Sequence, residues 1–266
     1  MHTAMPPVIV LMTDFGLSDT YIGQMKGVIL SLAPSAHILD LTHAISAQNI
    51  AEGAFLLSKS TPFFPDGTIF VAVVDPGVGT SRKAIAVETV RHTFLAPDNG
   101  LLTAIFQAEE VTRSVTITNE RYMLPFRSST FHGRDVFSPV AAHLASGVAL
   151  EELGTKIELA ECTRIPLPGC HTPNNGASWE GTIIYTDHFG NLITSLDSGV
   201  IERSKEWLVC AGEHQVPVCN TYCDVANRQT LAYAGSSGMI EIAVRNGNAA
   251  QMLGLRDGDT VRAFFR

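Results

Sequence analysis

Apolar residues in the first half of the chain form two continuous runs, at residues 8–12 and 69–74. Runs of this length, rich in valine and isoleucine, predict strands that are buried on both faces, as in a parallel sheet. A shorter apolar segment at residues 37–41 lies between them and predicts another strand. We therefore expect a mainly parallel sheet at the centre of the first half.

Between and after these runs, the apolar positions change to helical spacing. Residues 19–32, 47–59 and 135–145 carry apolar side chains every three or four positions and predict helices. Strands that alternate with helices of this length are typical of an α/β layer architecture. We predict the α/β fold class, with a layered N-terminal domain over residues 1–168.

The pattern changes at residues 166–176, where proline, glycine and asparagine accumulate, as in a linker. Beyond it, short apolar segments are separated by glycine, asparagine or aspartate turns. The sequence therefore predicts a smaller, β-rich, barrel-like domain over residues 177–266. Its expected strands lie at residues 181–185, 216–218, 239–243 and 260–265.

Composition narrows the possible partners. The chain has 266 residues, of which 45% are hydrophobic, and a net charge of −8, so it lacks the dense basic face that nucleic acid requires. No apolar run approaches the roughly 20 residues of a membrane span, and we expect no secretion signal. The five cysteines predict reduced thiols and a cytoplasmic protein. Cys219 and Cys223 have no second ligand pair, so we expect no metal there.

Both continuous apolar runs are followed by an acid, Asp14 after the first and Asp75 after the second. Ligands of open parallel sheets bind beyond the carboxyl ends of the strands, so these two carboxylates are candidates for one site. The alternative is that each forms a local turn or caps a helix.

Three further segments carry candidate chemistry. His132 precedes a predicted helix, where free N–H groups and the helix dipole favour anions, although a helix cap or a packed side chain is the alternative. Arg134 and Asp135 are interpreted as a capping and ion-pair contact. Residues 187–191 and 235–250 lie in the second domain; for His188 and Asn248 we favour hairpin turns without chemistry.

Together these segments resemble the S-adenosyl-L-methionine (SAM) hydroxide adenosyltransferases, the hydrolytic relatives of the fluorinase and chlorinase enzymes. The resemblance implies hydrolysis of SAM to adenosine and L-methionine, with SAM as the substrate and no cofactor. It also implies a homotrimer that combines residues of neighbouring subunits in each site. The matching segments, in order along the chain, are residues 13–16, 21–28, 74–79, 96–100, 131–135, 187–191 and 236–250.

Family residues carry over by position. The hydrolytic branch surrounds its water with an aspartate, an arginine and a histidine, which correspond here to Asp75, Arg82 and His132. The resemblance also assigns substrate contacts: Asp14 to the ribose hydroxyls, Asn191, Val244 and Asn246 to the adenine, and Asp187, Ser236 and Ser237 to the methionine. The halogenases have an uncharged residue at the position of Asp75 and an arginine at that of Ser237, so the binding of the methionine carboxylate is left open.

These residues suit attack at C5′ of the ribose. The leaving sulfur departs as a neutral thioether, so the unmet need is an activated water rather than a metal or a general acid. Whether Asp75 or His132 takes the proton is open at this stage. Three alternatives remain: a halogenase, disfavoured because a carboxylate repels halide, a metal-dependent hydrolase using Asp14, Asp75, His132 and Asp187, and a non-catalytic adenosine-binding module.

Overall fold

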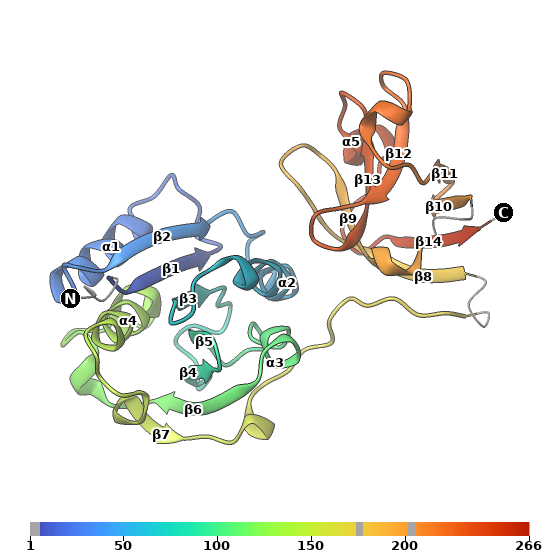
Figure 1. Ribbon diagram of the computed structural model, residues 1–266. Helices are drawn as coiled ribbons and strands as arrows, with labels where there is room; N and C mark the ends of the chain where they lie inside the picture. Colours follow the sequence, from blue (N-terminus) through green and yellow to red (C-terminus); the bar gives the residue numbers. More distant parts are fainter. Residues whose placement is uncertain (1–5, 174–177, 202–205, 266) are drawn as a thin grey trace, which may run out of the picture. The chain divides into compact units, whose positions relative to one another are not determined.

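The computed structural model describes residues 6–173, 178–201 and 206–265. The chain divides into two compact units, Met1–Pro166 and Leu167–Arg266 (Figure 1). Residues 174–176 of the expected linker and residue 177, the expected start of the second domain, lie outside the described residues.

The first unit is built on a seven-stranded mixed sheet. Strand β1 pairs in parallel with β2 and β3, β3 pairs in parallel with β5, and the remaining strands continue the sheet in antiparallel pairs. The α/β class is confirmed, with the parallel strands forming one half of the sheet. In sheet order the strands are β2 (His37–Thr42), β1 (Val8–Thr13), β3 (Ile69–Val73), β5 (Thr93–Pro97), β4 (Ala84–Thr89), β6 (Val111–Ile117) and β7 (Gly154–Lys156).

Both faces of this sheet are covered, which explains the continuous apolar runs. Ile9 and Leu11 of β1 belong to one buried cluster, whereas Val10 and Met12 belong to the other. Each such side chain contributes about 1.5–3 kcal/mol when it is fully buried. The helices are α1 (Tyr21–Leu32), α2 (Ile50–Ser60), α3 (Ile105–Ala108) and α4 (Ser138–Ala145), and a π-helical turn, Gly133–Phe137, leads directly into α4.

The second unit is a seven-stranded antiparallel sheet. A bridge between Val218 and Ala232 joins its two edge strands, so the sheet is nearly closed and the predicted barrel-like, β-rich fold is confirmed. The sheet order is β11 (His214–Pro217), β10 (Trp207–Ala211), β14 (Thr260–Phe265), β8 (Ser178–Thr186), β9 (Leu192–Asp197), β13 (Met239–Val244) and β12 (Thr230–Ala234), and α5 (Ala249–Leu253) follows β13.

The register of the first sheet determines where the candidate acids lie. Thr13, the last residue of β1, pairs with Val73, the last residue of β3. Asp14 and Asp75 therefore follow neighbouring strands at the same edge of the sheet. Among the described residues, none of the helices is long and apolar enough to cross a membrane.

Candidate active site

Asp75 is placed by a buried strand and by one side chain from a distant turn. The Nδ2 of Asn99 donates to the carbonyl oxygen of Val74 at 2.8 Å, directly before Asp75. The Oδ1 of Asn99 accepts the backbone N–H of Leu101 at 3.2 Å, which fixes the amide orientation. The segment at 96–100 therefore holds the end of β3, and Asp75 with it.

Arg82 joins Asp75 to His132. Its Nε donates to Oδ1 and Oδ2 of Asp75 at 3.1 and 3.0 Å, and its Nη2 donates to Oδ2 as well. The same Nη2 lies 2.8 Å from Nδ1 of His132. The Arg82 and Asp75 side chains are only 9% and 4% exposed, so this is a buried ion pair with a histidine attached. The three residues predicted to surround the water thus lie together.

This contact determines the protonation of His132. A guanidinium has only N–H donors, so Nδ1 of His132 must accept the hydrogen bond from Arg82. The ring is then neutral, and its single proton is on Nε2. Burial, and after it the charge of Arg82, lower the pKa of His132 below its ordinary value of 6.5, which favours the same neutral form. His132 is therefore a hydrogen-bond donor at Nε2.

Close packing brings the loop after Asp75 against the loop before His132. A Cβ on Gly79, whose φ is +79°, would lie 2.5 Å from the carbonyl oxygen of Ser129, so only glycine fits there. Asp135 is fully buried and accepts the N–H of Ser128 at 2.7 Å and Nε of Arg134 at 2.6 Å. The predicted ion pair of Arg134 and Asp135 is confirmed, but in place of the expected helix cap Asp135 holds this loop through Ser128.

Asp14 directly precedes a residue, Phe15, that lines an aromatic hollow. Its Oδ2 accepts the backbone N–H of Gln48 at 2.8 Å. The rings of Phe15, Tyr21 and Phe131 meet edge to face with centroids 5.1–6.0 Å apart, and they line a hollow of about 370 Å³. Aromatic rings of this kind suit a planar ligand, which would pack against them.

A buried histidine that the sequence analysis missed supports the loop of Asp14. Nδ1 of His43 lies 2.9 Å from Oγ1 of Thr13, and its carbonyl oxygen accepts the N–H of Gly16 at 2.8 Å. His43 thus contacts the residues on both sides of the Asp14–Phe15 pair. Its position in a short turn after a strand gave no signal of this role.

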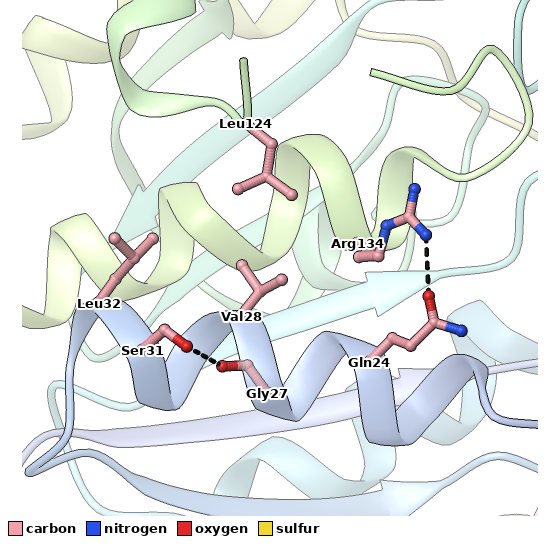
Figure 2. A pocket seen from close by; sticks show the side chains of 7 residues that line it. All are labelled: Gln24, Gly27, Val28, Ser31, Leu32, Leu124 and Arg134. Carbon is pink, nitrogen blue, oxygen red and sulfur yellow. Dashed lines mark hydrogen bonds between the residues drawn. The ribbon is translucent and has the colours of Figure 1, made fainter. Parts of the chain in front are cut away.

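Two further hollows differ in their relation to the site. One, of about 380 Å³, lies beside Arg82 and His132 and is also lined by Lys83 and Arg127, although Arg82 and Arg127 are paired with Asp75 and Glu120. The other, of about 400 Å³, lies along α1 (Figure 2). Its lining is mostly apolar, with an Arg134–Gln24 hydrogen bond at one end, and it includes none of the predicted site residues. Within the described part of the chain, no three histidine, cysteine, aspartate or glutamate side chains gather in a possible metal site.

In the second unit, Asp187 and Asn191 form one hydrogen-bonded turn. Oδ1 of Asp187 accepts the backbone N–H groups of Phe189 and Asn191 at 2.9 and 2.8 Å. Its Oδ2 accepts Nδ2 of Asn191 at 2.9 Å. Both carboxylate oxygens therefore hold the turn in shape, and the Asn191 side chain is fixed within it.

The segment at residues 244–250, which carries the predicted adenine contacts Val244 and Asn246, packs directly against this turn. A Cβ on Gly190 would lie 2.1 Å from the side chain of Asn248, and the N–H of Ala250 donates to the carbonyl oxygen of Gly190 at 3.1 Å. Val244 is buried at the end of β13, and Asn246 has a φ of +55°. Asn248 caps α5 through the N–H of Gln251 at 2.8 Å, which corrects the expectation of a hairpin turn.

Ser236 and Ser237 lie in the turn between β12 and β13. Ser236 is exposed. The hydroxyl of Ser237 is buried and has no hydrogen-bond partner among the described residues. A buried hydroxyl of this kind is costly unless a ligand or water satisfies it, so Ser237 is a candidate ligand contact.

Glu241 is a further buried acid that sequence reasoning missed. Tyr233 donates from Oη to Oε2 of Glu241 at 2.5 Å, and Oη of Tyr222 lies 2.6 Å from Oη of Tyr233. Burial, with an additional contribution from the charge of Asp187, raises the pKa of Glu241. An acid in the middle of an otherwise apolar strand, β13, was the available signal.

Comparison with known proteins gives a consistent result over nearly the whole chain. The model of the SAM hydroxide adenosyltransferase N-terminal domain matches residues 9–154, and that of the C-terminal domain matches residues 181–262. Proteins named (R)-S-adenosyl-L-methionine hydrolase are 38% identical in Thermus thermophilus and 36% in Salinispora tropica, over 97% and 96% of this chain and 99% and 97% of theirs.

Solved structures and more distant relatives agree with this result. A crystal structure of a conserved, uncharacterized protein from Thermotoga maritima has a TM-score of 0.88 and 34% identity, covering 96% of this chain and 99% of its own. A fluorinase from Actinopolyspora mzabensis is 26% identical over 96% of both chains. The sequence identity to the two named hydrolases thus exceeds that to this fluorinase by 12 and 10 percentage points.

Proposed function

The chain belongs to the SAM hydroxide adenosyltransferase family, and from this premise we propose that it hydrolyses (R)-S-adenosyl-L-methionine to adenosine and L-methionine. The printed names of its relatives support this substrate and its sulfonium configuration. The observation that carries the proposal is the buried Asp75–Arg82–His132 cluster, which supplies a carboxylate, a cation and a fixed N–H donor in one place.

In the proposed reaction, a water oxygen forms a bond to C5′ while the C5′–S bond breaks, and the bonding electron pair goes to sulfur. Methionine leaves as a neutral thioether, so no acid is needed at that end. The water gives one proton to Asp75, and the second stays on the adenosine hydroxyl. Asp75 suits this role because a carboxylate keeps lone pairs beyond those that accept from Arg82.

His132 has a different part in this proposal. Because Nδ1 accepts from Arg82 and Nε2 carries the proton, the neutral ring has no free lone pair with which to take a proton from water. Its Nε2–H instead donates to the water oxygen and orients it. Arg82 pairs with Asp75 and places His132, and its charge stabilises the hydroxide-like oxygen of the transition state.

We propose that the rest of the substrate binds as the family resemblance implies. Asp14 would accept the ribose hydroxyls, Asn191, Val244 and Asn246 would contact the adenine, and Asp187, Ser236 and Ser237 would surround the methionine. The unpartnered hydroxyl of Ser237 supports its assignment. Asp187 already accepts three hydrogen bonds within its own turn, so we expect it to act mainly by shaping that turn.

We also propose an active homotrimer, in which Asp14, Asp75 and His132 of one subunit act with Asp187, Asn191 and Ser237 of a neighbour. Support comes from the division of the motif set between two separate units of the chain. A cytoplasmic location is proposed as well, because all five cysteines are free thiols. No metal or cofactor enters the proposed reaction.

The deciding experiment is incubation of the purified protein with each sulfonium epimer of SAM, with and without chloride, followed by identification of the products. We expect adenosine and methionine from the (R) epimer at a rate that does not depend on chloride. Formation of 5′-chloro-5′-deoxyadenosine would support the halogenase alternative instead. Tight binding of SAM without turnover would support a binding module.

A further inference from the structure

Four side chains of the second unit form a continuous chain of hydrogen bonds. Nδ2 of Asn191 lies 3.2 Å from Oη of Tyr222, which lies 2.6 Å from Oη of Tyr233, which in turn lies 2.5 Å from Oε2 of Glu241. Asn191 and Glu241 are buried, and Tyr222 is partly exposed. The chain connects the turn at 187–191 with the middle of β13.

The end groups of this hydrogen-bonded series determine which group donates at each step. Ionised Glu241 can only accept, so Tyr233 spends its single proton on the carboxylate. Tyr222 must then donate its own proton to Tyr233, which leaves the Tyr222 oxygen free to accept from Asn191. Each donor in such a series polarises the next one, which strengthens the series as a whole.

Asn191 is held from a second side by Asp187. Oδ2 of Asp187 accepts the other N–H of the same amide nitrogen at 2.9 Å. An amide turned by half a rotation would place its own oxygen against this carboxylate, so the observed orientation is strongly favoured. Both amide protons are consumed inside the protein, and only Oδ1 remains to meet a ligand.

We propose that Asp187 and Glu241 are positioning residues that make Asn191 a pure hydrogen-bond acceptor, so that the second unit selects a purine carrying a 6-amino group over one carrying a 6-oxo group. This inference rests on the proposed function, which brings the adenine to Asn191. The 6-amino group is the only exocyclic donor of adenine. In hypoxanthine, a carbonyl oxygen stands there and would face the oxygen of Asn191.

The preference is measurable without turnover. Adenosine and inosine, the two reaction products with and without the amino group, are titrated calorimetrically into the wild-type protein. We expect adenosine to bind about 10- to 100-fold more tightly, the scale of one buried unsatisfied polar group. The same ratio is then measured as kcat/KM with SAM and with S-inosyl-L-methionine.

Variants of the hydrogen-bonded residues then test whether these residues orient the Asn191 amide or only stabilise the fold. Tyr222→Phe, Tyr233→Phe and Glu241→Gln should each lower the adenosine-to-inosine ratio by about threefold or more, while kcat stays near the wild-type value. Asp187→Asn should lower it most, because a new amide there can donate to Oδ1 of Asn191 and let that side chain turn. Tyr122→Phe is the matched control, since it removes a tyrosine–carboxylate hydrogen bond of 2.7 Å, to Glu152, in the other unit.

The outcomes are distinct. Equal affinity of the wild type for the two nucleosides, affinity for neither, or an unchanged ratio in all four variants would overturn the inference. A wild type that hydrolyses no SAM contradicts the proposed function, and the nucleoside titration still decides the inference. If Tyr233→Phe does not fold, the more exposed Tyr222→Phe provides the same test.

Discussion

Asp75 and Glu241 are both buried carboxylates, but the two units hold them in opposite ways. Asp75 lies against the cation of Arg82, whereas Glu241 is bonded to the neutral hydroxyl of Tyr233, and no ion pair to it forms among the described residues. A cationic partner offsets the buried charge of the carboxylate. A neutral donor only reduces the cost of burial, so the pKa of Glu241 is raised.

This difference teaches that a buried acid can have two distinct uses. The Asp75 cluster holds a charge-balanced carboxylate where the proposed reaction needs a proton acceptor, and the loss of Arg82 would leave that charge uncompensated. In the hydrogen-bonded series that ends at Glu241, one negative charge instead orients the neutral groups of Tyr233, Tyr222 and Asn191.

The largest effect should appear in stability. Arg82→Ala leaves Asp75 buried without its cation and should lower the free energy of unfolding by about 3–5 kcal/mol. Glu241→Gln removes a charge that folding disfavours, so at pH 7 it should be neutral or stabilising. Urea unfolding monitored by circular dichroism measures both, and equal destabilisation would erase the contrast between the two acids.

The difference in unfolding free energy between the wild type and Glu241→Gln should change with pH in one direction. The pKa of Glu241 is higher in the folded protein than its ordinary value of 4.5. Wild-type stability relative to Glu241→Gln should therefore be greatest below about pH 4.5 and fall as pH rises through the raised pKa. The opposite slope would mean that the carboxylate has a cationic partner in solution.

The second effect concerns turnover. Asp75→Asn keeps the shape and removes the charge, so kcat should fall by about 10²-fold or more, with little change in the dissociation constant for SAM. His132→Ala and Arg82→Ala should also reduce kcat, and the double variants should be less than additive because all three act on one water. Asp66→Asn, at an exposed surface ion pair, is the control.

Asp14→Ala should behave differently from Asp75→Asn, since its expected partner is the ribose. The loss should lie mainly in binding. Wild-type turnover in Asp75→Asn, or a loss confined entirely to substrate affinity, would show that Asp75 does not help to generate the nucleophile.

Two substitutions of His132 test which ring nitrogen carries its proton. Glutamine places an N–H near the position of Nε2, whereas asparagine reaches only the position of Nδ1. We therefore expect His132→Gln to retain about tenfold more kcat than His132→Asn, the scale of one hydrogen bond. The lowered pKa also places the acid limb of the wild-type rate profile below pH 6.5. A limb above that value, or equal rates for the two variants, contradicts the Nε2–H assignment.

The smallest effect should come from Asn99→Ala, which removes the hydrogen bond to the carbonyl of Val74. A typical bond of this kind contributes about 0.5–1.5 kcal/mol, so we expect a melting temperature lowered by a few degrees. The turnover loss should be smaller than in Asp75→Asn. An unchanged melting temperature together with full activity would show that the strand alone positions Asp75.

Sequence patterns located the parts of the fold that are buried on both faces. Residues 8–12 and 69–74 were identified as strands because every position is apolar. The antiparallel strands β4 and β6 were not, because polar residues at Glu88 and Arg113, which form an ion pair across the two strands, interrupt short apolar stretches. Such strands are defined by their neighbours rather than by their own periodicity.

For the candidate site, the sequence predicted the main residues but not the contacts that support them. A general rule, that ligands lie beyond strand ends, pointed to Asp14 and Asp75, and the family resemblance added Arg82 and His132. The supporting contacts were not predictable from local pattern. Asn99 reaches Val74 across 25 positions, and Asn191 reaches Tyr222 across 31, distances over which no periodicity operates.

The π-helical turn at Gly133–Phe137 has a consequence for how this segment tolerates insertion and deletion. The N–H of Ser138 bonds to the carbonyl of Gly133, five residues back, so the turn contains one residue more than an α-helical turn. If one residue inside this turn were removed, the same carbonyl and N–H could close a regular i→i+4 turn, so His132 would keep nearly the same direction relative to α4. A deletion within α4 itself would instead rotate the residues before it by about 100° around the helix axis and carry the imidazole away from Arg82. We therefore expect the segment between Gly133 and Ser138 to tolerate the loss of one residue other than Asp135 better than α4 does.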